Sequence, residues 1–164
     1  MRCRENTPFH RCCRFCQQRL PEFDVVVRRF DSAIVEFPNG GYDKARFTDS
    51  GHDDHFIGQP AKSTFEGNGF HFEVNQAEEV WVTSLNDADN DTAVLYDTAL
   101  DDLLRGSVNS NDESLIQFYT PDEFGQMLYQ LIDFEAVDAW GTTGTNKAEV
   151  DAANHVMLYG EWET

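Results

Sequence analysis

Carboxylates far outnumber basic side chains in this chain, and that imbalance limits the ways in which it can fold. The sequence holds 30 Asp and Glu residues against 12 Lys and Arg, a formal net charge of −18 at pH 7. Self-repulsion of this size opposes a compact state. A hydrophobic fraction of 40% and an aromatic fraction of 13% nevertheless supply enough apolar surface for a core. We therefore expect a folded domain whose carboxylates are mostly solvated.

The identity of the charged residues suggests the conditions under which such a domain is stable. Asp provides 17 of the acidic residues and Lys only 3 of the basic ones, a balance that resembles cytoplasmic proteins of extreme halophiles. Molar salt shortens the screening length to about 3 Å and so removes most of the repulsion between carboxylates. Two other interpretations stay open. The acidic surface could imitate nucleic acid and inhibit an enzyme that handles it, or it could dock on a basic partner.

Positive charge is concentrated at the N-terminus. Residues 1–20 contain five arginines and one acidic residue, a net charge of +4, whereas the rest of the chain carries −22. This polarity predicts a basic arm, residues 1–20, joined to an acidic domain, residues 21–164. Because molar salt weakens contacts to phosphates, we expect the arm to dock on an acidic surface of another protein or of a second copy, rather than on nucleic acid. The predicted docking residues are Arg2, Arg4, Arg11, Arg14 and Arg19.

All four cysteines lie in this arm. Cys13 and Cys16 have the C-x2-C spacing of a zinc knuckle, and clustered cysteines in a reducing cytoplasm favour a metal over disulfides. Cys3, His10 or Cys12 could complete the site, and the predicted ligand set is Cys3, His10, Cys13 and Cys16. The alternative is a reduced segment whose cysteines only pack, with the phenylalanines of the arm, against the domain.

The acidic domain is predicted to have an α+β fold. Its first half is rich in β-branched and aromatic runs separated by turn residues, which predicts a mostly antiparallel sheet with strands at 24–30, 33–37, 42–47, 62–65, 70–74 and 80–85. In the second half, helix-start signals precede apolar runs. Two or three helices packed on one face of the sheet are therefore expected. They are predicted at 98–104, at 121–132 and from 147, with strands at 114–119 and 156–159. No internal repeat is evident.

The most suggestive run for chemistry lies at residues 51–58. His52, Asp54 and His55 follow the order H-x-D-H-x-x-G, which resembles the second half of the H-x-H-x-D-H-x-x-G motif of metallo-β-lactamase-type hydrolases, with Ser50 in place of the first histidine. An Asp-His pair downstream of a C-x2-C is also similar to HNH nucleases. Either resemblance implies a divalent metal held by His52, Asp54 and His55.

Such a hydrolytic site needs a further ligand from elsewhere, for example Asp49 or His71. The simpler interpretation is an exposed polar loop, which we favour. Alternating carboxylates also occur at 86–91, as in calcium-binding loops. Thr92 and Thr98 stand, however, where such loops have a Gly and a bidentate Glu. We interpret this run as a loop that leads into a helix.

These observations predict a non-catalytic interaction or assembly protein. The sequence contains no G-x-S-x-G, P-loop or dinucleotide-binding pattern. It also has no apolar stretch near the ~20 residues of a membrane-spanning helix and no secretory h-region, so a cytoplasmic location, or one within a virion or assembly built there, is expected. The high-salt proteome could be cellular, viral or plasmid-borne. The alternatives are a metal-dependent hydrolase or nuclease and a nucleic-acid mimic.

The zinc hypothesis is tested by metal analysis of the purified full chain. One zinc per chain is expected, and Cys13→Ser should release it because the knuckle loses one of its two thiolates. Cys12→Ser should leave the zinc in place. A metal-free protein, or zinc retained in Cys13→Ser, would favour the packed, reduced segment.

Overall fold

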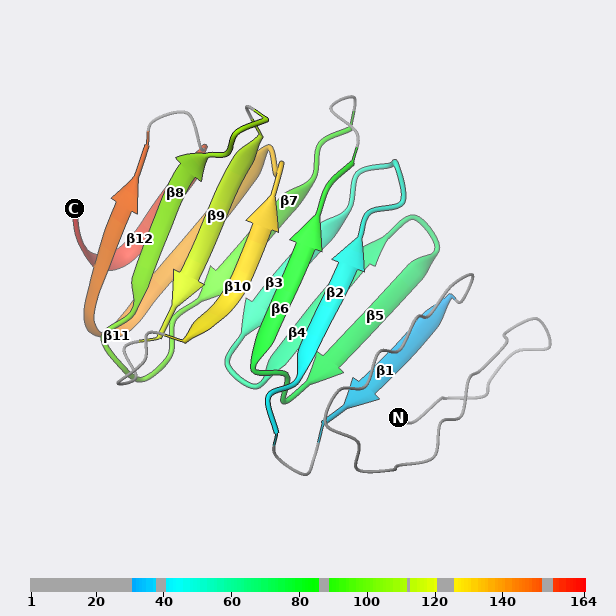
Figure 1. The fold of residues 1–164 in the computed structure, drawn as a ribbon, viewed down its shortest axis with the longest axis horizontal. Coiled ribbons are helices and arrows are strands. Elements are labelled where there is room, and N and C mark those ends of the chain that lie inside the picture. The colour runs from blue at the N-terminus through cyan, green and yellow to red at the C-terminus, as the bar shows by residue number, and fades with distance from the viewer. Residues whose placement is uncertain (1–30, 38–40, 86–88, 112, 121–125, 152–154) are drawn as a thin grey trace.

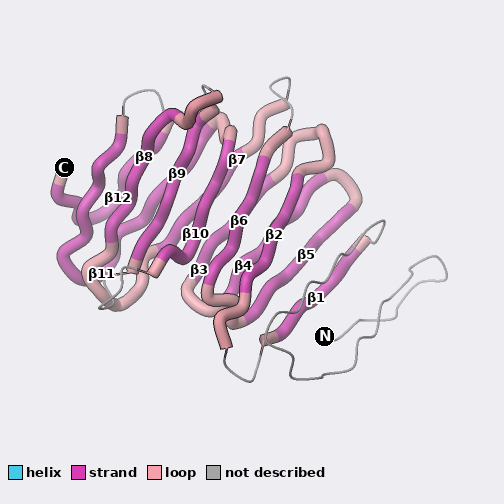
Figure 2. Tube along the Cα trace, viewed as in Figure 1, coloured by secondary structure: helices cyan, strands magenta, loops and turns pink. Residues whose placement is uncertain are grey.

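The computed structural model describes residues 31–37, 41–85, 89–111, 113–120, 126–151 and 155–164. All regular elements of this part are strands (Figures 1 and 2). They are β1 (Ser32–Glu36), β2 (Lys44–Thr48), β3 (His55–Gln59), β4 (Lys62–Gly67), β5 (Phe70–Asn75), β6 (Glu79–Thr83), β7 (Thr92–Tyr96), β8 (Leu103–Val108), β9 (Ser114–Tyr119), β10 (Met127–Ile132), β11 (Ala136–Val150) and β12 (Val156–Glu163).

The strands form one continuous sheet that folds over on itself. Its order is β1-β5-β4-β3-β7-β11-β8-β9-β10-β6-β2, with β12 paired to β11. The sheet bends at β11, whose residues 136–140 pair with β7 and whose residues 147–150 pair with β8. As a result, β7, β3, β4, β5 and β1 lie in one layer with the first part of β11 and with residues 156–160 of β12, whereas Trp162 and Glu163 of β12 pair beyond the bend with Asn146 and Lys147. The second part of β11 lies with β8, β9, β10, β6 and β2 in the other (Figure 1).

The space between the two layers is filled by an aromatic core. The ring of Phe47 on β2 lies 5.4 Å from that of Phe65 on β4 and 6.5 Å from that of Phe72 on β5, although β2 pairs with neither strand. Tyr129 on β10 reaches Phe56 on β3 in the same way. Each fully buried side chain of this size contributes about 1.5–3 kcal/mol to folding. The largest are Phe56, Phe65, Phe118, Leu95, Leu104, Ile116 and Leu131.

The chain passes between the layers along a repeated path. β2, β6 and β10 lie parallel in one layer, and each leads through a loop into β3, β7 or β11, which lie parallel in the other. The loop after β7 and the middle of β11 return the chain to the layer that contains β2, β6 and β10. These are the coils of a β-solenoid, and hairpins built from β4, β5 and β9 interrupt them.

The sequence analysis predicts no repeat, because neighbouring coils share backbone pairing and loop chemistry rather than residue identity. Equivalent loop residues stand 37 and then 44 positions apart, so the hairpins also make the period irregular. A fixed period is the signal that reveals a repeat in a sequence. The coils become visible only once the strand pairs are known.

The predicted α+β fold is wrong, because the described residues contain strands and no helix (Figure 2). Residues 103–108 form β8, residues 127–132 form β10 and residues 147–150 belong to β11. Residues 121–125, where the second helix is predicted to start, lie outside the described residues. It follows that no described helix is long and apolar enough to cross a membrane.

β10 shows why the helix signal misleads. Tyr129 and Leu131 are buried, and the residues beside them are only partly buried, so strand alternation is hidden inside an apolar run that also fits a helix. Pairing with β6 and β9 then selects the strand. This outcome illustrates how tertiary context overrides local helix preference.

The predicted sheet is confirmed in its local hairpin and wrong in its overall pairing. β4 and β5 form the hairpin expected at 62–74, and β9 occupies the expected 114–119. A mostly antiparallel sheet is not observed, since seven of the eleven strand pairs formed by the described residues are parallel. Parallel partners come from successive coils and are distant in sequence. The strand predicted at 24–30 lies outside the described residues.

Gly160 controls how closely β12 approaches β11. Its φ is +85°, and a Cβ there would lie 1.9 Å from the carbonyl oxygen of Gly141. Gly69 has a similar φ of +87° with nothing within 4 Å of the corresponding Cβ position.

Gly69→Ala should therefore cost about 1–2 kcal/mol of unfolding free energy for the backbone conformation alone. Gly160→Ala should cost clearly more, because β12 must also move. Equal losses in urea titrations would contradict this packing.

Candidate functional site

The loops that join the two layers are closed by buried aspartates. In the β2–β3 loop, the N–H and hydroxyl of Ser50 donate to the carboxylate of Asp54, at 2.7 and 3.0 Å. In the β7–β8 loop, Thr98 donates to Asp102 in the same way, at 2.6 and 2.9 Å. Asp54 and Asp102 are only 2% and 1% exposed. Each carboxylate thus folds its loop back just before the next strand begins.

Similar side chains also join one coil to the next. The N–H of Asp54 donates to Asp91 Oδ1 at 2.8 Å, and the N–H of Asp91 donates to Glu135 Oε2 at 2.6 Å. On the opposite side of the sandwich, the N–H of Asp102 donates to Asn146 Oδ1 at 3.0 Å. Polar side chains from consecutive coils therefore form a ladder along each side, where strand pairing no longer satisfies the backbone donors.

Asp97, on the side of the β7–β8 loop, is well supplied with donors. It accepts the N–H groups of Thr142 and Thr143, each at 2.7 Å, and an amide N–H of Asn146. Burial alone raises the pKa of Asp97, but these hydrogen bonds outweigh it and hold the pKa below its usual value. On the same side, burial and the charges of Asp97 and Asp101 raise the pKa of Asp102, so the ionised form is favoured at Asp97 alone of this pair.

On the other side, carboxylates crowd together with fewer donors. We call this group the acidic corner, and its members are Asp49, Asp54, Asp89, Asp91 and Glu135. Burial, together with the charges of Asp89 and Asp54, raises the pKa of Asp91 to about 6. Burial and neighbouring carboxylates also raise the pKa values of Asp54 and Glu135. Negative charge accumulates here because the β2–β3, β6–β7 and β10–β11 loops lie next to one another.

Three members of the acidic corner meet closely. One carboxylate oxygen from each of Asp49, Asp89 and Asp91 lies within 4.8 Å of the other two. Asp91 is fully buried, and its Oδ2 has no hydrogen-bond partner. Lys44, Lys62, Arg105 and Lys147 make their ion pairs elsewhere, and Arg46 lies over the ring of Trp81. Carboxylates in this arrangement are suited to holding a cation.

The residues predicted for a hydrolytic metal site are placed differently. His52 is exposed in the β2–β3 loop, Asp54 accepts hydrogen bonds from Ser50, and His55 Nδ1 contacts Thr92 Oγ1 at 2.8 Å. Among the described residues, these three do not bring their ligand atoms together as a group, whereas the three carboxylates of the acidic corner do. The predicted zinc ligands and the docking arginines of residues 1–20 lie outside the described residues.

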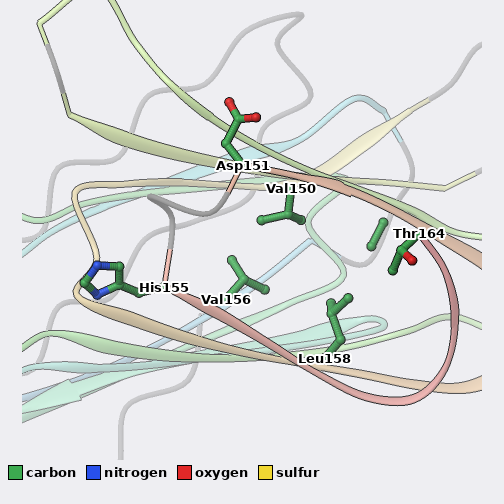
Figure 3. A pocket seen from close by; sticks show the side chains of 7 residues that line it. Val150, Asp151, His155, Val156, Leu158 and Thr164 are labelled. Atoms are coloured by element: carbon green, nitrogen blue, oxygen red, sulfur yellow. The ribbon is translucent and has the colours of Figure 1, made fainter.

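A second notable feature is the open end of the sandwich beyond β12. A cavity of about 250 Å³ lies between the last part of β11 and β12. Val150 projects into it from one side and Val156 and Leu158 from the other, with Asp151 and His155 at the rim (Figure 3). Within the described residues, this cavity therefore exposes apolar side chains at the last coil.

β12 lies at an edge of the sheet. Within the part of the chain that the structure describes, it pairs with β11 alone. It is eight residues long and contains neither Pro nor Lys, and its protection is limited to Glu161, Glu163 and a register shift in its pairing with β11. Met157 is 55% exposed, and the ring of Tyr159 stacks on Trp140 at 4.4 Å. The last strand of the sheet thus presents apolar surface beside free backbone groups.

Comparison with protein-family models, with curated proteins and with solved structures finds no match to this chain.

The acidic corner was missed by sequence reasoning, which interpreted residues 86–91 as a loop leading into a helix. Two signals were present: the alternating carboxylates at 86–91, and the spacing shared by Ser50-x-x-x-Asp54 and Thr98-x-x-x-Asp102 before a strand. Neither of them reveals that Asp49 meets Asp89.

The raised pKa of Asp91 makes stability depend on pH. Folding lifts this pKa from the ordinary 3.8 to about 6, so between these values the folded state binds more protons than the unfolded state. Stability from this group therefore increases as the pH falls from 7 to about 4. Asp91→Asn should remove that gain and should be more stable than wild type at pH 8 in metal-free buffer. Asp138→Asn, on the outer face of β11, should keep the wild-type slope. Urea titrations across this range measure it, and an unchanged slope in Asp91→Asn would contradict the assignment.

Proposed function

We propose that this chain is a non-catalytic assembly module that docks end to end on further copies of itself. The observation that carries the proposal is the open core beside β12. Val150, Val156 and Leu158 line an accessible cavity at the last coil. In solenoid proteins each coil buries its apolar face against its neighbours, and terminal coils need a cap. A second copy supplies such a cap.

The strand directions support a copy as the occupant. β1 runs parallel to β5, which has the same direction as β3 through the two antiparallel pairs with β4. β3, β7, β11 and β12 are parallel as well. β1 and β12 therefore stand at opposite ends of one layer and run in the same direction. A translated copy would place its β1 beside β12 as a parallel neighbour.

Arg46 gives the two ends one pair of opposite charges. Near the open core, Asp151, Glu161 and Glu163 provide negative charge. At the other end, β2 carries Arg46, whose guanidinium lies 4.3 Å from the centre of the Trp81 ring, whereas Lys44 is already paired with Glu79. Head-to-tail contacts of this kind do not close and generate filaments. Because each copy has a net charge of −18, we expect association to require salt that screens the overall repulsion.

The basic arm extends this proposal. Its five arginines and its predicted zinc site lie outside the described residues, and their role in docking on an acidic surface stays a prediction. The arm and the β12 end are separate contacts and can be tested separately. The metal-dependent hydrolase and the nucleic-acid mimic also stay predictions, as does origin from a high-salt proteome.

The assembly proposal is tested by light scattering of the full chain in molar KCl over a range of protein concentrations. The mass should rise above 18.7 kDa as concentration increases. Val156→Lys places an ammonium group at the open core, and Met157→Lys guards the edge without changing a core residue. Both should shift association to at least tenfold higher concentration.

Val108→Lys is the matched control, since Val108 is a 42% exposed strand residue on β8. It should associate like the wild type. Circular dichroism checks that each variant is folded, and Met157→Lys remains informative if Val156→Lys is not. A wild type that stays monomeric at every concentration, or equal behaviour of Met157→Lys and Val108→Lys, would overturn the proposal.

A further inference from the structure

We propose that the acidic corner binds one calcium ion through Asp49, Asp89 and Asp91. This inference is independent of the assembly proposal, because the three carboxylates lie in the β2–β3 and β6–β7 loops, whereas the assembly proposal rests on the cavity beside β12 and on strands β1 and β2. The ion would hold two successive coils together.

The first observation that supports this inference is the position of the three carboxylates. Asp49 directly follows β2, and its Oδ2 accepts the N–H of Leu85 at 3.0 Å, which fixes one loop against the other. Asp89 and Asp91 come from the β6–β7 loop. Because one oxygen from each residue lies within 4.8 Å of the other two, a common centre lies about 2.8 Å or less from all three. Calcium–oxygen distances in proteins are about 2.3–2.6 Å.

The buried oxygen of Asp91 provides a second and separate observation. Asp91 is 0% exposed, its Oδ1 accepts the N–H of Asp54, and its Oδ2 has no hydrogen-bond partner. The one described donor group beside it is the hydroxyl of Ser84, only 4% exposed, which favours the ionised form of Asp91 but forms no hydrogen bond of regular geometry. A buried charged oxygen that is poorly satisfied is strongly unfavourable. A cation at the acidic corner would satisfy it.

The ligand set indicates calcium rather than another metal. All candidate donors are hard oxygens, whereas zinc and copper sites are built with His or Cys. Of the two histidines that follow Asp49 most closely, His52 is exposed and His55 already contacts Thr92 Oγ1 through Nδ1. Magnesium requires near-octahedral geometry and keeps several waters, while calcium accepts several carboxylates in irregular, flexible loops. Carboxylates from two loops match the calcium preference.

Binding would relieve the electrostatic conflict of the corner. A divalent cation offsets the repulsion among Asp49, Asp89 and Asp91 and attracts the nearby Asp54 and Glu135. Since the unfolded chain does not hold these carboxylates together, calcium binds the folded state and stabilises it in proportion to its concentration. The thermal midpoint should therefore rise with added calcium.

The test uses the full chain freed of metal with EGTA and kept in KCl of constant ionic strength. Titration calorimetry with CaCl2 is expected to show one ion per chain, together with an increase in the thermal midpoint. Asp91→Asn should lose the calcium response at least tenfold while being as stable as the calcium-free wild type, or more so. Asp49→Asn, which removes a less buried ligand, should also lose the response.

Asp138→Asn is the control for net charge, because it removes one carboxylate from β11 and should bind calcium like the wild type. Circular dichroism verifies folding, and Asp49→Asn keeps the test decisive if Asp91→Asn does not fold. Absence of calcium binding to the wild type would overturn the proposal. So would an equal response to MgCl2, or an equal loss in Asp138→Asn, since these outcomes would indicate general charge screening.

Discussion

The structure depends on acceptor side chains that take the backbone N–H groups of a neighbouring coil. Asp91 accepts the N–H of Asp54, Glu135 accepts that of Asp91, and Asn146 accepts that of Asp102. At these corners the chain leaves one layer for the other, so strand pairing does not supply the acceptors. An unsatisfied buried donor costs about 1–3 kcal/mol, and a carboxylate offers several lone pairs without adding a donor. Short acidic side chains therefore suit the corners.

The same solution creates an electrostatic conflict. Where hydroxyl and amide donors surround the carboxylate, as at Asp97, ionisation is favoured. Where carboxylates of successive coils lie side by side, as at Asp91, burial and mutual repulsion raise the pKa. Part of the acid excess therefore serves the interior of the loops and is not explained by surface solvation alone. The brine interpretation remains a prediction for the exposed carboxylates.

Local sequence patterns predicted local structure, but they did not predict the pairing of strands that are distant in the sequence. The hairpin of β4 and β5 follows from alternation around a Gly-rich turn, and β9 lies where expected. β8 and β10 were mistaken for helices because short apolar runs fit both periods, and their parallel partners are distant in sequence. The acidic corner depends on which coil lies beside which. For that reason the loop carrying Asp89 and Asp91 gave no indication that it meets Asp49.

The bend of the sheet at β11 has a consequence for cooperativity. A strand that belongs to both layers is the common template on which β7 and β8 assemble. β7 pairs with residues 136–140 and β8 with residues 147–150 of this one strand, so displacement of β11 as a whole removes hydrogen-bond partners from both layers and opens both sides of the sandwich. Hydrogen exchange in the two halves of β11 should thus report one shared opening event, in contrast to the independent fraying expected of layers connected only by loops.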